Sequence, residues 1–435
     1  MNTSIIRGRA LTFKRKPNSV TDTESYNFTE DGALFVKNGI ISKVGSFSDV
    51  KAEATKEIVI HDHRPHLIVP GFIDTHLHFP QIQMIGSYAA SLLEWLNTYA
   101  FFEEQKYKDP FHSENMAKQF FNTLINHGTT TAAVFCTVHP ESVEAFFKES
   151  HLRNMLMIGG KVMMDQNAPA ELLDTPQSGY DDNKILIKKW HGVGRQYYAI
   201  SPRFAITSTP EQLEMSQTLV EEHPNCYLQT HLSENKDEII LAKKLYPNCN
   251  DYTGIYERYN LLGPNSLFGH CIHLSEREVA IMSETKSVAV FCPTSNLFLG
   301  SGLFDLQRFL KQQLPVRVAT GTDIGGGTNY SMLKTMDEAY KILRLQGQRL
   351  SPIESFYQIT LGNALALSLE NKIGTFEVKS DADIIVLDAR ATPTMRLRMK
   401  TVKNIAEELF VLQTMSDDRS VAQVYIKGMP SKNLH

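Results

Sequence analysis

Two pairs of histidines at HxH spacing lie close together near the start of the chain. Residues 61–78 read HDHRPHLIVPGFIDTHLH, which places His61 with His63 and His76 with His78. Neutral imidazole is a common zinc ligand, and side chains two positions apart on a β-strand point to the same face, where they can share one ion. Since both pairs have the same spacing, their position relative to the predicted strands has to distinguish them.

Four further side chains that can bind a metal or transfer a proton lie in β-rich segments later in the chain. Any one of them alone is more often a hydrogen-bonded core or turn residue. Taken together, several imidazoles and a carboxylate, with one position left for water, form the donor set of a catalytic zinc site. These side chains are His231 and Glu234 in CYLQTHLSE, His270 in SLFGHCIHL and Asp323 in RVATGTDIGG.

Eight β-rich segments alternate with helical segments from residue 67 onward. This alternation predicts a (β/α)8 TIM-like barrel rather than an open doubly wound sheet, since no glycine-rich phosphate motif follows the first segment. Barrel enzymes build their active sites at the C-terminal ends of the strands, which is where these polar residues lie. The predicted strands are 67–79, 128–138, 154–165, 197–205, 226–234, 266–274, 287–296 and 317–326.

The two ends of the chain have a different pattern. Stretches such as GALFVKNGIISKVGS near the start and SVAQVYIKG near the end alternate in polarity as hairpin strands do. We expect residues 1–66 and 374–435 to form one small β-sandwich-like domain. Residues 67–373 are then the catalytic α/β barrel.

The histidines of HDHRPH precede the first predicted barrel strand and lie on its N-terminal side, which is the stability face of a barrel. Pro65 interrupts strand pairing there. His66 is separated from His76 by roughly ten residues, or about 33 Å of extended chain. We therefore expect His76 and His78 to bind a metal and the earlier histidines not to.

Composition restricts the class of partner. The 435 residues carry a formal net charge of −4, and no apolar run is long enough to span a membrane. This predicts a cytoplasmic enzyme that acts on a small molecule and binds neither nucleic acid nor a membrane. The five cysteines are widely spaced without a CxxC, so we expect neither disulfides nor a structural zinc site.

Several motifs carry a family resemblance. PGFIDTHLH, QTHLSEN, GHCIHLS, FCPTSN and GTDIGGG are similar, in order and placement, to motifs of the metal-dependent amidohydrolase superfamily. Within it, PQIQMIGSYAASLLEWLN, GKVMMDQNAP, SPRFAITSTPEQ, HLSENKDE, CPTSNLFLGSGLF and MLKTMDEAYKI resemble the guanine deaminases, from about residue 30 to 428. Gly269, Ile206, Asn329 and Tyr330 depart from the family pattern. The last two are expected in a loop over the pocket.

The resemblance implies one zinc per chain and the roles of the residues around it. Glu234 would act as the proton shuttle, His270 would orient and stabilise the attacking hydroxide, and Asp323 would accept a proton as the intermediate collapses. The implied metal ligands are His76, His78, His231 and Asp323.

The resemblance also implies the substrate. Guanine and water would give xanthine and ammonia in purine catabolism or salvage, with Arg203, Gln81 and Phe204 recognising the base. His78, His231 and Asp323 would also contact it, and Phe79 and Pro80 would shape the pocket wall. The family further implies a homodimer.

The sequence leaves two alternative functions open. One is a related mononuclear amidohydrolase acting on another purine or aminated heterocycle, and another is a non-catalytic scaffold on the same fold. A two-metal amide hydrolase would need a bridging lysine or acid at the end of the fourth strand, where YYAISPRFA has none, and Lys161 lies in the third run, where we expect a structural ion pair. The HxE and PCxxC signature of the other zinc deaminase fold is absent.

Overall fold

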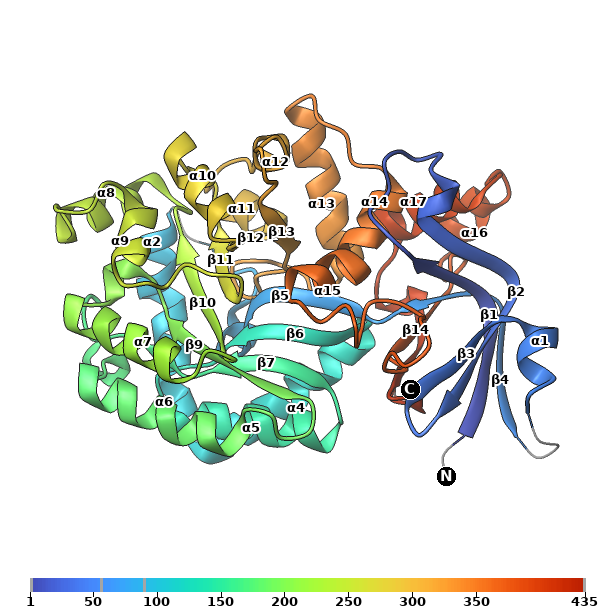
Figure 1. Ribbon diagram of the computed structural model, residues 1–435, viewed down its shortest axis with the longest axis horizontal. Helices are drawn as coiled ribbons and strands as arrows, with labels where there is room; N and C mark the ends of the chain where they lie inside the picture. Colours follow the sequence, from blue (N-terminus) through green and yellow to red (C-terminus); the bar gives the residue numbers. More distant parts are fainter. Residues whose placement is uncertain (1–2, 55–57, 89–90, 433–435) are drawn as a thin grey trace.

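The computed structural model describes residues 3–54, 58–88 and 91–432. Figure 1 shows a barrel of strands and helices beside a sheet that contains segments from both ends of the chain. No helix in the described part of the chain is long and apolar enough to cross a membrane.

Eight parallel strands form the barrel, as the alternation of the sequence predicted. Each strand pairs with the next in chain order, and β8 (Val162–Met163) extends the pairing beside the fourth strand. The eight strands are β5 (Phe72–His78), β6 (Thr129–Phe135), β7 (Leu156–Gly160), β9 (Gln196–Pro202), β10 (Tyr227–Leu232), β11 (Ser266–His270), β12 (Val288–Phe291) and β13 (Arg317–Thr320).

The barrel closes between its first and last strands. The backbone N–H of Asp323 donates to the carbonyl of His76 at 2.7 Å, and the N–H of His78 donates to the carbonyl of Ile324 at 2.6 Å. These bonds lie at the C-terminal ends of β5 and β13. They join the segments that carry three of the predicted metal ligands.

Helices follow the strands and cover the outside of the barrel (Figure 1). Many begin at a side-chain cap: Thr209 accepts from the N–H of Gln212, and Ser275 forms a capping box with Glu278. These helices are α4 (Pro110–Asn126), α5 (Pro140–Leu152), α6 (Pro176–Trp190), α7 (Pro210–Glu222), α8 (Lys236–Leu245), α9 (Tyr252–Arg258), α10 (Glu276–Glu284), α11 (Pro293–Phe298), α12 (Leu306–Leu310) and α13 (Met332–Leu345).

Shorter helices complete the chain. Two of them, α2 (Leu92–Trp95) and α3 (Phe101–Glu104), lie between β5 and α4 and contribute to the site described below. The others are α1 (Phe47–Lys51), α14 (Pro352–Tyr357), α15 (Asn363–Ala366), α16 (Pro393–Met399) and α17 (Ile405–Met415).

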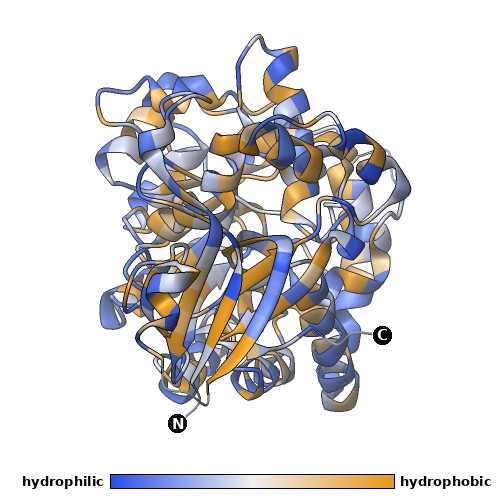
Figure 2. Cartoon of the chain, turned by 90° about the vertical axis from the view of Figure 1, so that its right-hand side faces the viewer, coloured by the Kyte–Doolittle hydropathy of each residue, from blue (hydrophilic) through white to orange (hydrophobic). Residues whose placement is uncertain are grey.

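Both chain ends supply strands to one seven-stranded sheet. Figure 2 views the molecule from the side on which this sheet lies, and hydrophobic and hydrophilic residues both occur along its strands. This confirms the predicted second β unit. Its order is β16 (Met429–Pro430), β15 (Val421–Ile426), β14 (Ile384–Leu387), β4 (Val59–Pro70), β1 (Thr3–Phe13), β2 (Tyr26–Lys37) and β3 (Ile40–Ser46).

The first predicted barrel strand, 67–79, is divided in the structure. Residues 67–70 end β4 and pair with β14 in the small sheet, while the barrel strand β5 begins at Phe72. Gly71 lies between them, and a Cβ there would be 2.0 Å from Oγ1 of Thr130, so only glycine allows the chain to pass β6 this closely. β4 runs across residue 66. The division into a domain of residues 1–66 plus 374–435 and a barrel of residues 67–373 is kept as a proposal.

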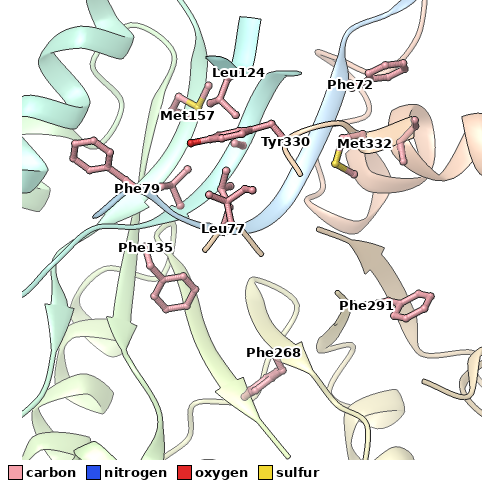
Figure 3. Packing of buried hydrophobic residues seen from close by; sticks show 14 of the residues in the cluster. Phe72, Leu77, Phe79, Leu124, Phe135, Met157, Phe268, Phe291, Tyr330 and Met332 are labelled. Carbon is pink, nitrogen blue, oxygen red and sulfur yellow. The ribbon is translucent and has the colours of Figure 1, made fainter. Parts of the chain in front are cut away.

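The barrel core is apolar and aromatic (Figure 3). Phe79 is fully buried there, and the centre of its ring lies 5.0 Å from that of Tyr107. Contrary to the expectation, it does not line the pocket. Tyr330 also packs inward, with the centre of its ring 5.8 Å from that of His127, and its side chain does not line the pocket. In both cases an aromatic ring finds more apolar contact in the core than at the mouth.

Candidate active site

The C-terminal ends of β5 and β13 bring two histidines and an aspartate together. Nε2 of His76 and Nε2 of His78 each lie 3.4 Å from Oδ1 of Asp323. Two glycines leave room for His76: a Cβ on Gly269 would lie 2.5 Å from its ring, and one on Gly321 would lie 2.7 Å from its backbone nitrogen. The departure from the family pattern at Gly269 therefore leaves space that this ring occupies.

The third histidine comes from β10. Nδ1 of His231 lies 2.7 Å from the backbone carbonyl of Arg203, which can only accept, so this nitrogen carries the proton. The other ring nitrogen, Nε2, is left with its lone pair and lies 3.1 Å from Nε2 of His78. A backbone carbonyl that fixes the tautomer in this way is a regular feature of metal-binding histidines.

Burial sets the charge of this group. It lowers the pKa of His76, and it lowers the pKa values of His78 and His231 well below the ordinary range, so the three rings are neutral at physiological pH. Burial alone would raise the pKa of Asp323, but its interaction with the His76 side chain, and next the charge of the nearby His270, whose own pKa is raised, hold it well below its usual range. The result is three neutral nitrogen donors beside one carboxylate.

This donor set fits a divalent cation. Nε2 of His76 is buried without a hydrogen-bond partner in the described part of the structure, although an unpartnered buried nitrogen is costly. Burial raises the pKa of the Cys292 thiol well above its ordinary value, which favours the protonated form over a thiolate ligand. Two overlapping groups have ligand atoms within 4.8 Å of one another, namely His76, His78 and His231, and His76, His270, Cys292 and Asp323.

Two proton-transferring groups face the same point. Oε2 of Glu234 lies 3.4 Å from Nε2 of His270, and the hydroxyl of Ser301 donates to Oε1 of Glu234 at 2.9 Å. Nδ1 of His270 is 2.9 Å from the side-chain oxygen of Asn296. Burial raises the pKa of Glu234 to about 7, which suits a group that accepts and returns a proton near neutral pH.

A cavity opens beside these groups. Of the residues predicted to bind the metal, transfer protons or recognise the base, all except His76 line it, and they come from five strands or the loops after them. Phe79 and Pro80, which were expected to shape its wall, do not line it. Four apolar lining residues were not predicted, because they lie on segments outside the barrel strands: Leu92, Trp95, Leu96 and Leu299.

One more residue touches the predicted base-recognition side chains and was also missed. Glu104 on α3 is fully buried, and its carboxylate accepts from Nε2 of Gln81 at 2.8 Å and from Nη1 of Arg203 at 2.6 Å. Its only sequence signal is a pair of adjacent glutamates in FFEEQ, which resembles an exposed helix surface.

The histidines of HDHRPH lie elsewhere, in the small sheet. His63 hydrogen-bonds the hydroxyl of Tyr425 at 2.6 Å, and His66 lies 3.6 Å from Asp388. The β1 ladder pairs residues 59–62 and 67–68 but skips those between, which include Pro65. Lys161, in the third predicted strand, forms the expected structural ion pair: its Nζ lies 2.5 Å from Oδ2 of Asp174.

This separation gives a direct prediction. Replacing both His61 and His63 by glutamine is expected to leave the metal content of the purified protein unchanged, whereas His76→Gln is expected to lower it substantially because a buried nitrogen ligand is lost. Elemental analysis of the folded proteins measures both. Loss of metal from the double variant with its fold intact would show that the wrong histidines had been assigned.

Comparison with known proteins places the chain in a family. The amidohydrolase family model matches residues 67–430. The chain belongs to the amidohydrolase family. The motif resemblance seen in the sequence is thereby confirmed.

Named relatives are also similar over most of the chain. The guanine deaminase of Escherichia coli (strain K12) is 49% identical over 92% of this chain and 91% of its own, and that of Mus musculus is 32% identical over 83% and 82%. A structure of E. coli guanine deaminase superposes with a TM-score of 0.96 at 47% identity, covering 98% of this chain and 99% of that one. A C. acetobutylicum guanine deaminase with bound guanine has a TM-score of 0.89 at 28% identity, covering 99% and 100%.

Proposed function

We propose that this protein catalyses the hydrolytic deamination of guanine to xanthine and ammonia, with one zinc ion per chain. The observation that carries the proposal is a cavity lined by two neutral histidines, a carboxylate, a glutamate of raised pKa and an arginine–glutamine pair, with a third neutral histidine, His76, beside Asp323. The similarity to guanine deaminases over nearly the whole chain supports the same substrate. The presence of the full set of ligands argues against a non-catalytic scaffold.

The ion would be held by His76, His78, His231 and Asp323. When bound, a divalent cation lowers the pKa of a water molecule enough for hydroxide to form near neutral pH. Three imidazole nitrogens and one carboxylate oxygen can bind zinc or iron. The availability of each metal in the cell therefore contributes to which ion is bound.

The protein's own groups handle the protons. Glu234 accepts a proton from the attacking water, passes it to ring N3 of guanine as C2 is attacked, and later helps protonate the departing amino group. His270, 3.4 Å from Glu234, orients the water. Asp323 accepts the remaining proton as the tetrahedral intermediate collapses. General acid–base catalysis of this kind contributes about 10²- to 10⁴-fold to the rate.

The base is recognised by hydrogen-bonding side chains and by apolar ring surfaces. Arg203 offers guanidinium N–H donors to the oxo oxygen and ring nitrogen of guanine, and Gln81 offers an amide. Phe204 and the unpredicted Trp95 supply apolar ring surface to a flat heterocycle. We also propose, from the family resemblance alone, a cytoplasmic homodimer.

The test of this function is product formation from guanine. Purified protein is expected to release ammonia and xanthine in equal amounts from guanine. Detection of turnover with another aminated heterocycle, but none with guanine, would favour the related-amidohydrolase alternative and leave the fold assignment intact.

Metal removal gives a further prediction. Treatment with a chelator is expected to abolish turnover, and addition of zinc to restore it, because no side chain in the cavity can lower the pKa of water as a cation does. Elemental analysis is expected to find about one ion per chain. About two would favour a two-metal amide hydrolase, and full activity without any ion would contradict the proposal.

A further inference from the structure

A buried carboxylate joins the two polar residues that are proposed to read the base. Glu104 has 0% of its surface exposed, and each of its oxygens accepts a hydrogen bond from one of them: Oε1 from Nε2 of Gln81 and Oε2 from Nη1 of Arg203. A buried carboxylate is costly unless its oxygens are paired. Here the partners are two side chains that line the substrate cavity, rather than groups of the surrounding scaffold.

The carboxylate determines which way the Gln81 amide faces. A carboxylate paired with a guanidinium has no hydrogen to donate, so the NH2 end of the amide must point at Glu104. The amide oxygen is then the group that Gln81 contributes to the cavity. Gly325 leaves room for this orientation, since a Cβ there would lie 2.9 Å from the amide oxygen of Gln81.

The same carboxylate holds Arg203 in place. One guanidinium nitrogen is occupied by Glu104, and the guanidinium carbon lies 5.4 Å from the ring centre of Phe101, three residues earlier on α3. The remaining N–H groups can only donate. Because Gln81 and Arg203 bind one carboxylate, an acceptor and a set of donors lie side by side in the cavity.

We propose that Glu104 is a specificity-determining positioning residue: by fixing Gln81 as an acceptor beside Arg203 as a donor, it makes the pocket select a ring N–H next to an oxo group. Guanine has this lactam edge. An amino-substituted purine has the reverse, a ring nitrogen that accepts next to an amino group that donates. The proposal rests on the proposed function and names the chemical feature that the pocket selects.

Glu104→Gln tests the proposal. The new amide can donate as well as accept, so Gln81 is free to turn over and present its NH2 end to the cavity. The two substrates to compare are guanine and 2,6-diaminopurine, which share the C2 amino group and differ at the lactam edge. Glu104→Gln is expected to lower kcat/KM for guanine about tenfold to 100-fold, mainly through KM, because one donor or acceptor is left unmatched.

The selectivity is the informative measurement. The ratio of kcat/KM for guanine to that for 2,6-diaminopurine is expected to fall at least about tenfold, since only guanine loses a matched edge. Glu103→Gln is the matched control: it lies on the same helix and pairs with Lys106 at 2.6 Å. It is expected to change neither rate nor ratio. In a Gln81→Ala background, Glu104→Gln is expected to have a smaller effect on the ratio.

Two results would overturn the inference. One is an equal loss for both purines, which would indicate a purely structural role, and the other is a Glu104→Gln ratio equal to that of the control. If Glu104→Gln does not fold, Glu104→Asp gives the same comparison, because its shorter carboxylate keeps the charge but cannot reach both partners. Failure of the wild-type protein to deaminate guanine would instead refute the proposed function itself.

Discussion

Glu234→Gln is expected to keep its bound metal and to lose about 10²- to 10⁴-fold in kcat. The amide has nearly the same shape and can still accept from the hydroxyl of Ser301, 2.9 Å from Oε1 of Glu234 in the structure. It cannot take up a proton near neutral pH, which burial enables the carboxylate to do by raising its pKa to about 7. The loss should therefore be in the chemical step rather than in guanine binding.

Steady-state kinetics and elemental analysis on the same preparation test this expectation. The matched control is Glu278→Gln, another buried carboxylate, whose oxygens bond Ser275 and Thr253 at a helix start rather than the cavity. It should affect stability more than kcat. Near-normal turnover of Glu234→Gln would remove Glu234 from the mechanism.

Asp323→Asn is expected to reduce both metal content and kcat, the latter by at least about 10²-fold. The carboxylate lies 3.4 Å from two imidazole nitrogens and is the one anionic group in the proposed ligand set. Its removal takes away the charge that compensates a divalent cation, and also the acceptor proposed for the last proton. Measuring activity with excess zinc separates the two effects: a defect that zinc fully repairs would limit Asp323 to metal binding.

Asp74→Asn is the control for this variant. Asp74 is also fully buried and lies near the same strands, but its oxygens accept from the backbone N–H groups of His76 and Thr322 and from the hydroxyl of Thr322. An asparagine can keep the first two bonds with its oxygen and donate its NH2 to that hydroxyl. Its metal content is expected to stay close to that of the wild type. Equal metal loss in both variants would mean that the loss reflects packing rather than ligation.

The barrel and most of the site could be predicted from the sequence for a physical reason. Strands that are buried on both faces are largely apolar segments, so the ionisable residues at their ends stand out, as with His231 after CYLQT and Asp323 after RVATGT. Because parallel strands all end at one face of a barrel, side chains far apart in the sequence must meet there. The cavity lining agrees with that reasoning.

The features that were missed lack such a signal. Glu104 reaches the cavity from a short helix whose position depends on tertiary packing, so the 23 residues that separate it from Gln81 carry no periodic pattern that joins them. The segment 67–79, expected as one strand, is divided inside the apolar run LIVPGFID, where only Pro70 and Gly71 indicate a break. The strand pairing that divides this run is a long-range contact, which local pattern does not show.

A competition assay among nucleobases tests directly whether guanine is the preferred substrate of this enzyme. The metal-loaded protein is given an equimolar mixture of guanine, adenine, cytosine and 8-oxoguanine, and the loss of each base and the formation of its product are followed by chromatography. Guanine is expected to be consumed first, with xanthine as the main product. Preferential consumption of any other base in the mixture would contradict this expectation.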